Sequence, residues 1–334
     1  MRRAGGGRIR DTRCEIRDNS SIVYPVSRIP YPASRITHLA SRIPDHDSRI
    51  TNHGFQVRTQ LVSIPTDTMP LEGAFHEPDS GGAAGAVLLF HGSTLNFYVC
   101  APRFLPPVLT RLGLACLAFN RHGHDILSTR NSRTVEGGAF QSTREAIADN
   151  RIAAEWLEAR GFPAPVVIGH SYGGMLGTQH VVDHPQTPAL VLLSAGRGGA
   201  TAGRESGTER LFAMDRFDEL HARALELVKA GRGRELLLMP GWWYVISAES
   251  FLDRISSVPD TIALAPRIKC PVLCIRGDRE DVHRYPAEEF QRAAGGPCQV
   301  EIIPDCDHFY NGRESQVAGI VASWLARTLG PRKA

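Results

Sequence analysis

The pentapeptide Gly169-His170-Ser171-Tyr172-Gly173 stands between an apolar run, residues 165–168, and a helix-like run, residues 174–182. A strand that turns into a helix at a G-x-S-x-G sequence makes a sharp bend, which strains the serine backbone and lifts its hydroxyl clear of the sheet. Glycines fit this bend because a Cβ would collide with the neighbouring strand and helix. The position of the motif therefore predicts a layered fold with an accessible serine, and a Gly/Ser turn without a role is the alternative.

Short apolar runs alternate with longer helical patterns along most of the chain. Candidate buried strands cover residues 86–90, 114–119, 166–168, 189–194, 272–275 and 299–303. Candidate helices cover residues 102–112, 142–160, 174–182, 286–294 and 314–329. Residues 56–64 and 69–76 precede them and read as an antiparallel hairpin. This order predicts an α/β fold with a mostly parallel central sheet, covered by helices on both faces and carrying an antiparallel edge.

The segment from about residue 196 to 267 interrupts this alternation. It is too long for an ordinary loop and contains helical runs such as residues 217–230, so we predict a helical lid inserted after the sixth strand. The aromatic stretch 240–246, which includes Trp242 and Trp243, lies in this segment. These aromatic side chains could form the core of the lid, line a pocket for an apolar substrate, or do both.

Residues 1–53 have a different character. The tripeptide Ser-Arg-Ile recurs every seven residues, but four prolines between residues 25 and 44 exclude a coiled coil. Low apolar content with high charge predicts a disordered basic extension over residues 1–53, followed by one domain over residues 54–334. A basic interaction arm, a targeting segment and a start codon assigned too far upstream are the alternatives for this extension.

The charge and the cysteines exclude several classes of function. Residues 1–53 carry ten arginines and five acidic residues, a charge of +5, which leaves the remaining residues with −2 of the total of +3. We therefore expect no nucleic-acid partner for the domain. The seven cysteines include no C-x-x-C pair and no metal-ligand spacing, which predicts reduced thiols, a cytoplasmic location and no metal. No apolar stretch reaches 18 residues, so no transmembrane helix is expected.

Together these features resemble the α/β-hydrolase family over roughly residues 56–329. That family places a nucleophile at a strand–turn–helix bend, then an acid, then a histidine, in this chain order. The resemblance implies the α/β-hydrolase fold, with Ser171 as the nucleophile. It implies that His308, in the loop after residues 299–303, is the base, and a surface loop histidine beside Asp307 is the alternative.

The resemblance places the acid in the turn Gly277-Asp278-Arg279-Glu280-Asp281. The acid of the family usually lies three residues after the glycine, at Glu280. Asp281, one residue further on and the more common residue type, remains the alternative, since either carboxylate could orient an imidazole and stabilise its cation. The implied oxyanion hole consists of two backbone amides, that of Tyr172 and that of Ser93 in the loop after residues 86–90.

The implied function is that of a serine hydrolase, which cleaves a carboxylic ester or a related acyl substrate through an acyl-enzyme. The expected partner is a small-molecule acyl substrate, whose pocket we expect His170, Trp242 and Trp243 to line. Neither a cofactor nor a metal is required. Thioesterase, lactonase, C–C bond hydrolase and peptidase chemistry on the same fold, and ligand binding without catalysis, are the alternatives.

Overall fold

The central sheet has the strand order β1-β2-β4-β3-β5-β6-β9-β10. The computed structural model describes residues 57–78, 82–129, 133–199, 213–241 and 244–330, and all of these lie in one unit, Asn52–Ala334. The predicted extension over residues 1–53 falls outside the described residues. Among the helices of the described ranges, none combines the length and the apolar character that crossing a bilayer requires.

The predicted hairpin and antiparallel edge are confirmed. β1 pairs antiparallel with β2 and β2 pairs antiparallel with β4, whereas the pairings from β4 through to β10 are parallel. The strands of this sheet are β1 (Val57–Ile64), β2 (Leu71–Pro78), β3 (Gly85–Phe90), β4 (Leu114–Phe119), β5 (Val166–His170), β6 (Leu190–Leu193), β9 (Val272–Gly277) and β10 (Cys298–Ile303).

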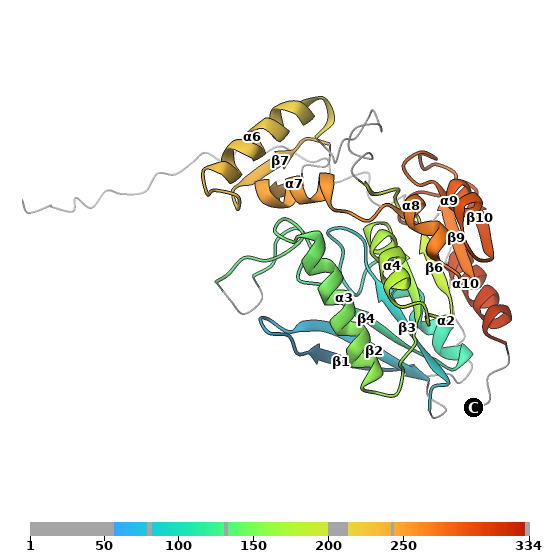
Figure 1. Cartoon of the computed structure of the whole chain (residues 1–334). Coiled ribbons are helices and arrows are strands. Elements are labelled where there is room, and N and C mark those ends of the chain that lie inside the picture. The colour runs from blue at the N-terminus through green and yellow to red at the C-terminus, as the bar shows by residue number, and fades with distance from the viewer. Residues whose placement is uncertain (1–56, 79–81, 130–132, 200–212, 242–243, 331–334) are drawn as a thin grey trace, which may run out of the picture. The chain divides into compact units, whose positions relative to one another are not determined.

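Helices cover both faces of the sheet, as the alternation predicts (Figure 1). One face packs against α1 (Ala101–Phe104), α2 (Pro106–Leu109) and α10 (Glu314–Leu329). The other face packs against α3 (Thr143–Glu158), α4 (Tyr172–Asp183) and α9 (Ala287–Ala293). Because successive side chains of a strand point to opposite faces, β3 contributes Val87 and Leu89 to the first core and Leu88 and Phe90 to the second.

Local sequence decides where these helices begin and end. The prediction of one helix over residues 102–112 is wrong, because α1 ends at Phe104 and α2 begins at Pro106, where the proline ring removes the N–H that would continue the first helix. By contrast, α3 begins where its sequence predicts. Ser142 and Glu145 form a complete capping box, in which each side chain accepts a hydrogen bond from the backbone N–H of the other residue.

The inserted segment, residues 196–267, contains a small core of its own. Its described part includes α6 (Phe217–Lys229), α7 (Ala248–Ser256), α8 (Thr261–Leu264) and an antiparallel hairpin of β7 (Leu236–Met239) with β8 (Tyr244–Ser247). The segment thus contains the expected helices and, in addition, a hairpin that the sequence analysis did not predict. Side chains along β7 alternate between exposed and buried, and the buried ones join the apolar faces of α6 and α7. The function of the segment as a lid stays a prediction.

Candidate active site

Ser171 occupies a strained bend between β5 and α4. Its backbone has φ 55° and ψ −120°, a region that residues with a side chain rarely adopt. A Cβ on Gly173 would overlap the carbonyl oxygen of Phe90, and a Cβ on Gly169 would overlap the backbone of Gly173. Glycine is required at both positions because β3 and α4 approach the bend so closely. The bend therefore has the geometry that the sequence predicts.

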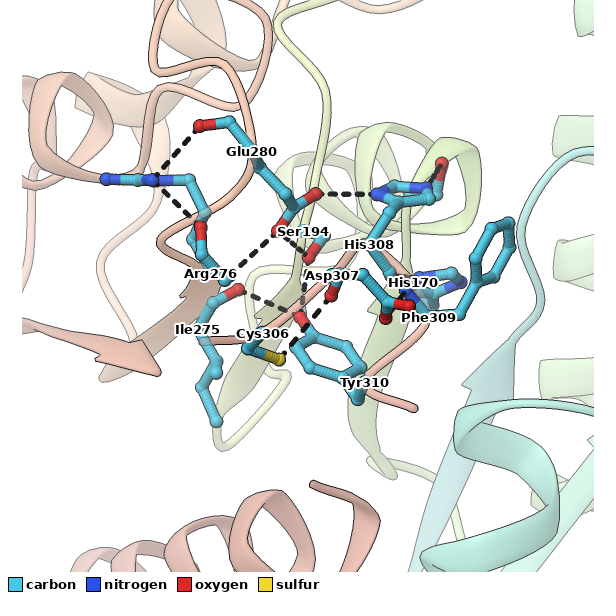
Figure 2. Close-up of polar contacts among 12 residues, drawn as sticks. His170, Ser194, Ile275, Arg276, Glu280, Cys306, Asp307, His308, Phe309 and Tyr310 are labelled. Carbon is cyan, nitrogen blue, oxygen red and sulfur yellow. Dashed lines mark hydrogen bonds and ion pairs between the residues drawn. The ribbon is translucent and has the colours of Figure 1, made fainter. Parts of the chain in front are cut away.

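Three side chains from distant parts of the chain meet beyond the carboxyl ends of parallel strands. Ser171 follows β5, Glu280 follows β9 and His308 follows β10. The Nε2 atom of His308 lies 3.0 Å from the Oγ atom of Ser171. Its Nδ1 atom lies 2.6 Å from an Oε atom of Glu280, and Figure 2 shows this carboxylate directed at the imidazole. The structure thus brings the predicted serine, histidine and acid into one chain of hydrogen bonds.

Glu280 is only 8% exposed, and three donors hold its carboxylate. One oxygen accepts the bond from His308, while the other accepts from the hydroxyl of Ser194 at 2.6 Å and from the amide of Gly277 at 2.8 Å. The Ser194 hydroxyl is in turn 2.7 Å from the hydroxyl of Tyr310 (Figure 2). These hydrogen bonds fix the orientation of the carboxylate toward the imidazole.

Sequence reasoning did not nominate Ser194 or Tyr310. The available signal was positional, since Ser194 directly follows β6 and Tyr310 comes two residues after His308. The contact of Ser194 with the carboxylate depends on the sheet, which brings β6 beside β9, and Tyr310 contacts Ser194 in turn. Ser194 supports the carboxylate directly and Tyr310 supports it through Ser194, and neither side chain contacts Ser171 in the described hydrogen bonds.

The alternative acid, Asp281, has different partners. Its carboxylate is exposed and accepts the backbone amides of His283 at 2.9 Å and Arg284 at 2.8 Å, which closes the turn after β9. Asp281 makes no described hydrogen bond to His308. Of the two carboxylates, Glu280 is the one that contacts the imidazole.

The loop after β3 lies directly beside the bend. A Cβ added to Gly92 would lie 3.3 Å from the Cβ of Ser171 and 3.1 Å from the Nδ1 atom of His170. The backbone amides of Ser93 and Tyr172, which the sequence predicts as donors, have no acceptor among the hydrogen bonds of the described residues. Two free N–H groups next to a nucleophile are what stabilisation of an oxyanion requires.

A sequence model of the alpha/beta hydrolase family matches residues 87–320. The chain belongs to the alpha/beta hydrolase family. No curated protein matches its sequence significantly.

Several solved structures share the fold of this hydrolase. Est1E from Butyrivibrio proteoclasticus, with ferulic acid bound, superposes with a TM-score of 0.63 at 16% identity, covering 80% of this chain and 99% of Est1E. GrgF, an alpha/beta hydrolase from Penicillium sp. sh18, gives a TM-score of 0.60 at 13% identity, covering 81% of this chain and 99% of its own. The esterase domain of a Rhodothermus marinus protein gives 0.53 at 18% identity, covering 82% of this chain and 100% of the domain. At these identities the similarity establishes the fold.

His170, which directly precedes Ser171 in this α/β hydrolase, packs behind His308. It is 1% exposed, its Nε2 atom donates to the carbonyl oxygen of His308 at 2.9 Å, and the two rings lie 4.9 Å apart. Burial, with the neighbouring His308 as a second cause, lowers the pKa of His170 to about 3, so it is neutral at neutral pH. The described contacts of His170 are with protein groups, and its expected place in a substrate pocket stays a prediction. Trp242 and Trp243, the other expected pocket residues, fall outside the described residues.

A buried histidine holds the loop after β3 in place. The Nδ1 atom of His91 donates to the carbonyl oxygen of Gly92 at 2.8 Å, and its Nε2 atom accepts the backbone amide of Arg121 at 3.2 Å. Burial lowers the pKa of His91 well below its usual value, which keeps the ring neutral and its two nitrogens in these different roles. The loop that carries Ser93 is therefore tied to the end of β4.

Proposed function

We propose that this α/β hydrolase is a serine hydrolase that cleaves a carboxylic ester or a related acyl bond through an acyl-enzyme. The observation that carries the proposal is the hydrogen-bonded chain from the Ser171 hydroxyl through His308 to the buried carboxylate of Glu280. Strain at the bend also supports it, because backbone strain persists where surrounding structure enforces it and is common at active sites.

In the proposed mechanism, Ser171 attacks the carbonyl carbon of the substrate while the Nε2 atom of His308 takes the serine proton. Glu280 holds the other imidazole proton on Nδ1, so that Nε2 faces the serine as an acceptor, and it stabilises the imidazolium that forms. His308 then returns the proton to the leaving alcohol. A water molecule, deprotonated by the same imidazole, hydrolyses the acyl-enzyme and regenerates Ser171.

The developing negative charge on the substrate oxygen would be stabilised by the amides of Ser93 and Tyr172. Donors fixed in this way require little reorganisation during the reaction, and the loss of one typically costs about 3 kcal/mol of transition-state stabilisation. The neutral His170 behind the imidazole adds no competing positive charge. An ester is favoured among acyl substrates because the Rhodothermus marinus structure of similar fold is an esterase domain.

The direct test is hydrolysis of short-chain aryl esters by wild-type protein and by Ser171→Ala. We expect the variant to lose roughly four or more orders of magnitude in kcat while circular dichroism and the melting temperature stay those of wild type. Ser63→Ala, on the exposed edge strand β1, is the matched control and should keep full activity. If Ser171→Ala hydrolysed the esters within tenfold of the wild-type rate, the proposal would be wrong.

A further inference from the structure

Arginine side chains are buried close to the proposed active site. The described part of the chain contains three of them, Arg121, Arg254 and Arg276, which are 1%, 7% and 4% exposed. Arg276 forms an ion pair with Glu288 at 2.7 Å. Within the described residues, neither Arg121 nor Arg254 forms an ion pair. A cation removed from water without a counter-ion is costly, so these two arginines need a reason to be buried.

Arg254 reaches the proposed oxyanion hole from α7 of the inserted segment. Its Nη1 atom donates to the Oγ atom of Ser93 at 3.1 Å, and its guanidinium lies 3.9 Å from the ring centre of Tyr172. Its Nε atom is buried without a hydrogen-bond partner. The amides of Ser93 and Tyr172 are the two that we place on the oxyanion of the substrate. Arg254 therefore contacts the side chains of both residues whose amides we place on the oxyanion, and its Nε donor is unused.

Arg121, from the loop after β4, places a second guanidinium near the aromatic ring of Tyr172. Its guanidinium is 5.7 Å from the ring centre of Tyr172, and its Nη2 atom donates to the carbonyl oxygen of His91 at 2.6 Å. Its Nε and Nη1 atoms are buried without partners, as is the Tyr172 hydroxyl. Burial lowers the pKa of Arg121 to about 10, so the guanidinium keeps its charge at neutral pH.

The acid next to Arg254 in sequence does not neutralise it. The Asp253 carboxylate accepts the backbone amide of Thr143 at 2.6 Å and the hydroxyl of Thr143 at 2.7 Å, which fixes α7 against the start of α3. Ser247 caps the other end of α7 and donates its backbone amide to the carbonyl oxygen of Ala139 at 2.8 Å. The position of Arg254 is therefore built into the fold, and its missing counter-ion is not supplied by its own helix.

We propose that the substrate of this hydrolase carries a carboxylate a few bonds from its scissile carbonyl, and that Arg254 binds this carboxylate with Arg121 reinforcing the positive field. This inference rests on the proposed function, because it assigns a substrate class to the Ser171 site. A guanidinium matches a planar carboxylate with two parallel N–H bonds, which an ammonium cannot do. A neutral ester would leave both buried cations unpaired, so discrimination should appear in kcat/KM.

The test compares an anionic ester with a neutral ester of the same shape. The anionic substrates are the monoethyl esters of succinate, glutarate and adipate. The neutral ones are ethyl esters in which an isopropyl group replaces the free carboxylate. Ethanol release gives kcat/KM for wild type, for Arg254→Met and for Arg223→Met, a control on the exposed side of α6 in the same segment. Methionine keeps an unbranched apolar stem and removes the charged guanidinium.

We expect wild type and Arg223→Met to favour at least one anionic ester by about tenfold or more, the size of effect that charge-assisted hydrogen bonds give. Arg254→Met should lose most of this preference, and Arg254→Lys should recover part of it. A wild type that hydrolyses both esters through Ser171 without preferring the anionic one would overturn the inference and leave the proposed function standing. Failure of Ser171 to react at all would instead refute the proposed function.

A second measurement decides the matter if Arg254→Met does not fold. Glutarate should slow the labelling of Ser171 by a fluorophosphonate probe in wild-type protein, whereas glutaramide, its neutral counterpart, should have no effect. Equal labelling rates with and without glutarate, at concentrations up to tens of millimolar, would count against a carboxylate site. Hydrolysis of none of the anionic esters by a wild type whose Ser171 is labelled would also overturn the inference.

Discussion

Replacing Glu280 by glutamine separates the charge of the proposed acid from its shape. The carboxylate accepts three hydrogen bonds, from His308, Ser194 and Gly277. A glutamine has one oxygen acceptor and one NH₂ donor in place of two acceptors. If its oxygen faces His308, its NH₂ group and the N–H of Gly277 are two donors that face each other without an acceptor. If its NH₂ group faces His308, the imidazole must carry its proton on Nε2 and cannot accept the proton of Ser171.

The size of the effect follows from the 2.6 Å distance between the Glu280 oxygen and the His308 Nδ1 atom. Opposite unit charges at this distance attract by about 6 kcal/mol at an effective dielectric constant of about 20. Glutamine removes this attraction from the imidazolium of the transition state. Since about 1.4 kcal/mol corresponds to tenfold in rate, we expect Glu280→Gln to lower kcat by up to about four orders of magnitude.

The assay is the initial rate of ester hydrolysis, with Asp281→Asn as the matched control. The exposed carboxylate of Asp281 closes a turn, so its amide variant should keep more than about a third of the wild-type rate. Melting temperatures of both variants exclude unfolding as the cause of a loss. The reasoning is refuted if Asp281→Asn is the slower of the two variants, or if Glu280→Gln retains activity within tenfold of wild type.

Two further predictions concern stability. Gly173→Ala, whose Cβ would overlap the carbonyl oxygen of Phe90, should lower the free energy of unfolding by about 3 kcal/mol. Gly177→Ala, whose Cβ would lie 3.3 Å from the Cγ1 atom of Val167, should lower it by less than about 1 kcal/mol. Equal losses of the two variants in urea unfolding would contradict the close approach of Gly173 to β3. Burial lowers the pKa of His170 and His180 to about 3, so below pH 6.5 the unfolded chain binds protons that the folded chain does not. As the pH is lowered from 6 to 4, the free energy of unfolding should therefore fall by about 1.4 kcal/mol per pH unit for each of these histidines. His180→Gln should reduce that slope, and an unchanged slope would contradict the burial of His180.

The sequence predicted those parts of the fold in which local pattern and packing agree. The buried strand Leu114–Phe119 and the helix Glu314–Leu329 have their predicted bounds. The first is a continuous apolar run and the second a long amphipathic one, and each is typical of its structure. The contact of His308 with Ser171 and Glu280 was expected from the resemblance to the α/β-hydrolase family, and it forms because the strand ends bring these residues to one end of the parallel sheet.

The remaining features depend on contacts between distant segments. Residues 236–239 are a short apolar run, whose pairing with β8 cannot be read from periodicity over four residues. Arg254 lies on an amphipathic helix, where an arginine usually reads as part of a solvated face. Its partners in the fold, Tyr172 and Ser93, lie far earlier in the chain, Ser93 by 161 residues. The role of Ser194 could not be predicted from its own sequence context, because its partner, Glu280, follows a different strand, β9.

The measurement that tests the central claim most directly is intact-mass spectrometry after exposure to a fluorophosphonate probe. Wild-type protein and Ser171→Ala are compared under identical conditions, with circular dichroism to show that both are folded. We predict one covalent adduct on wild type, mapped by peptide sequencing to Ser171, and none on the variant, because only a serine activated by His308 and Glu280 should react. A folded wild type that remains unlabelled, or an equal adduct on Ser171→Ala, would contradict the account.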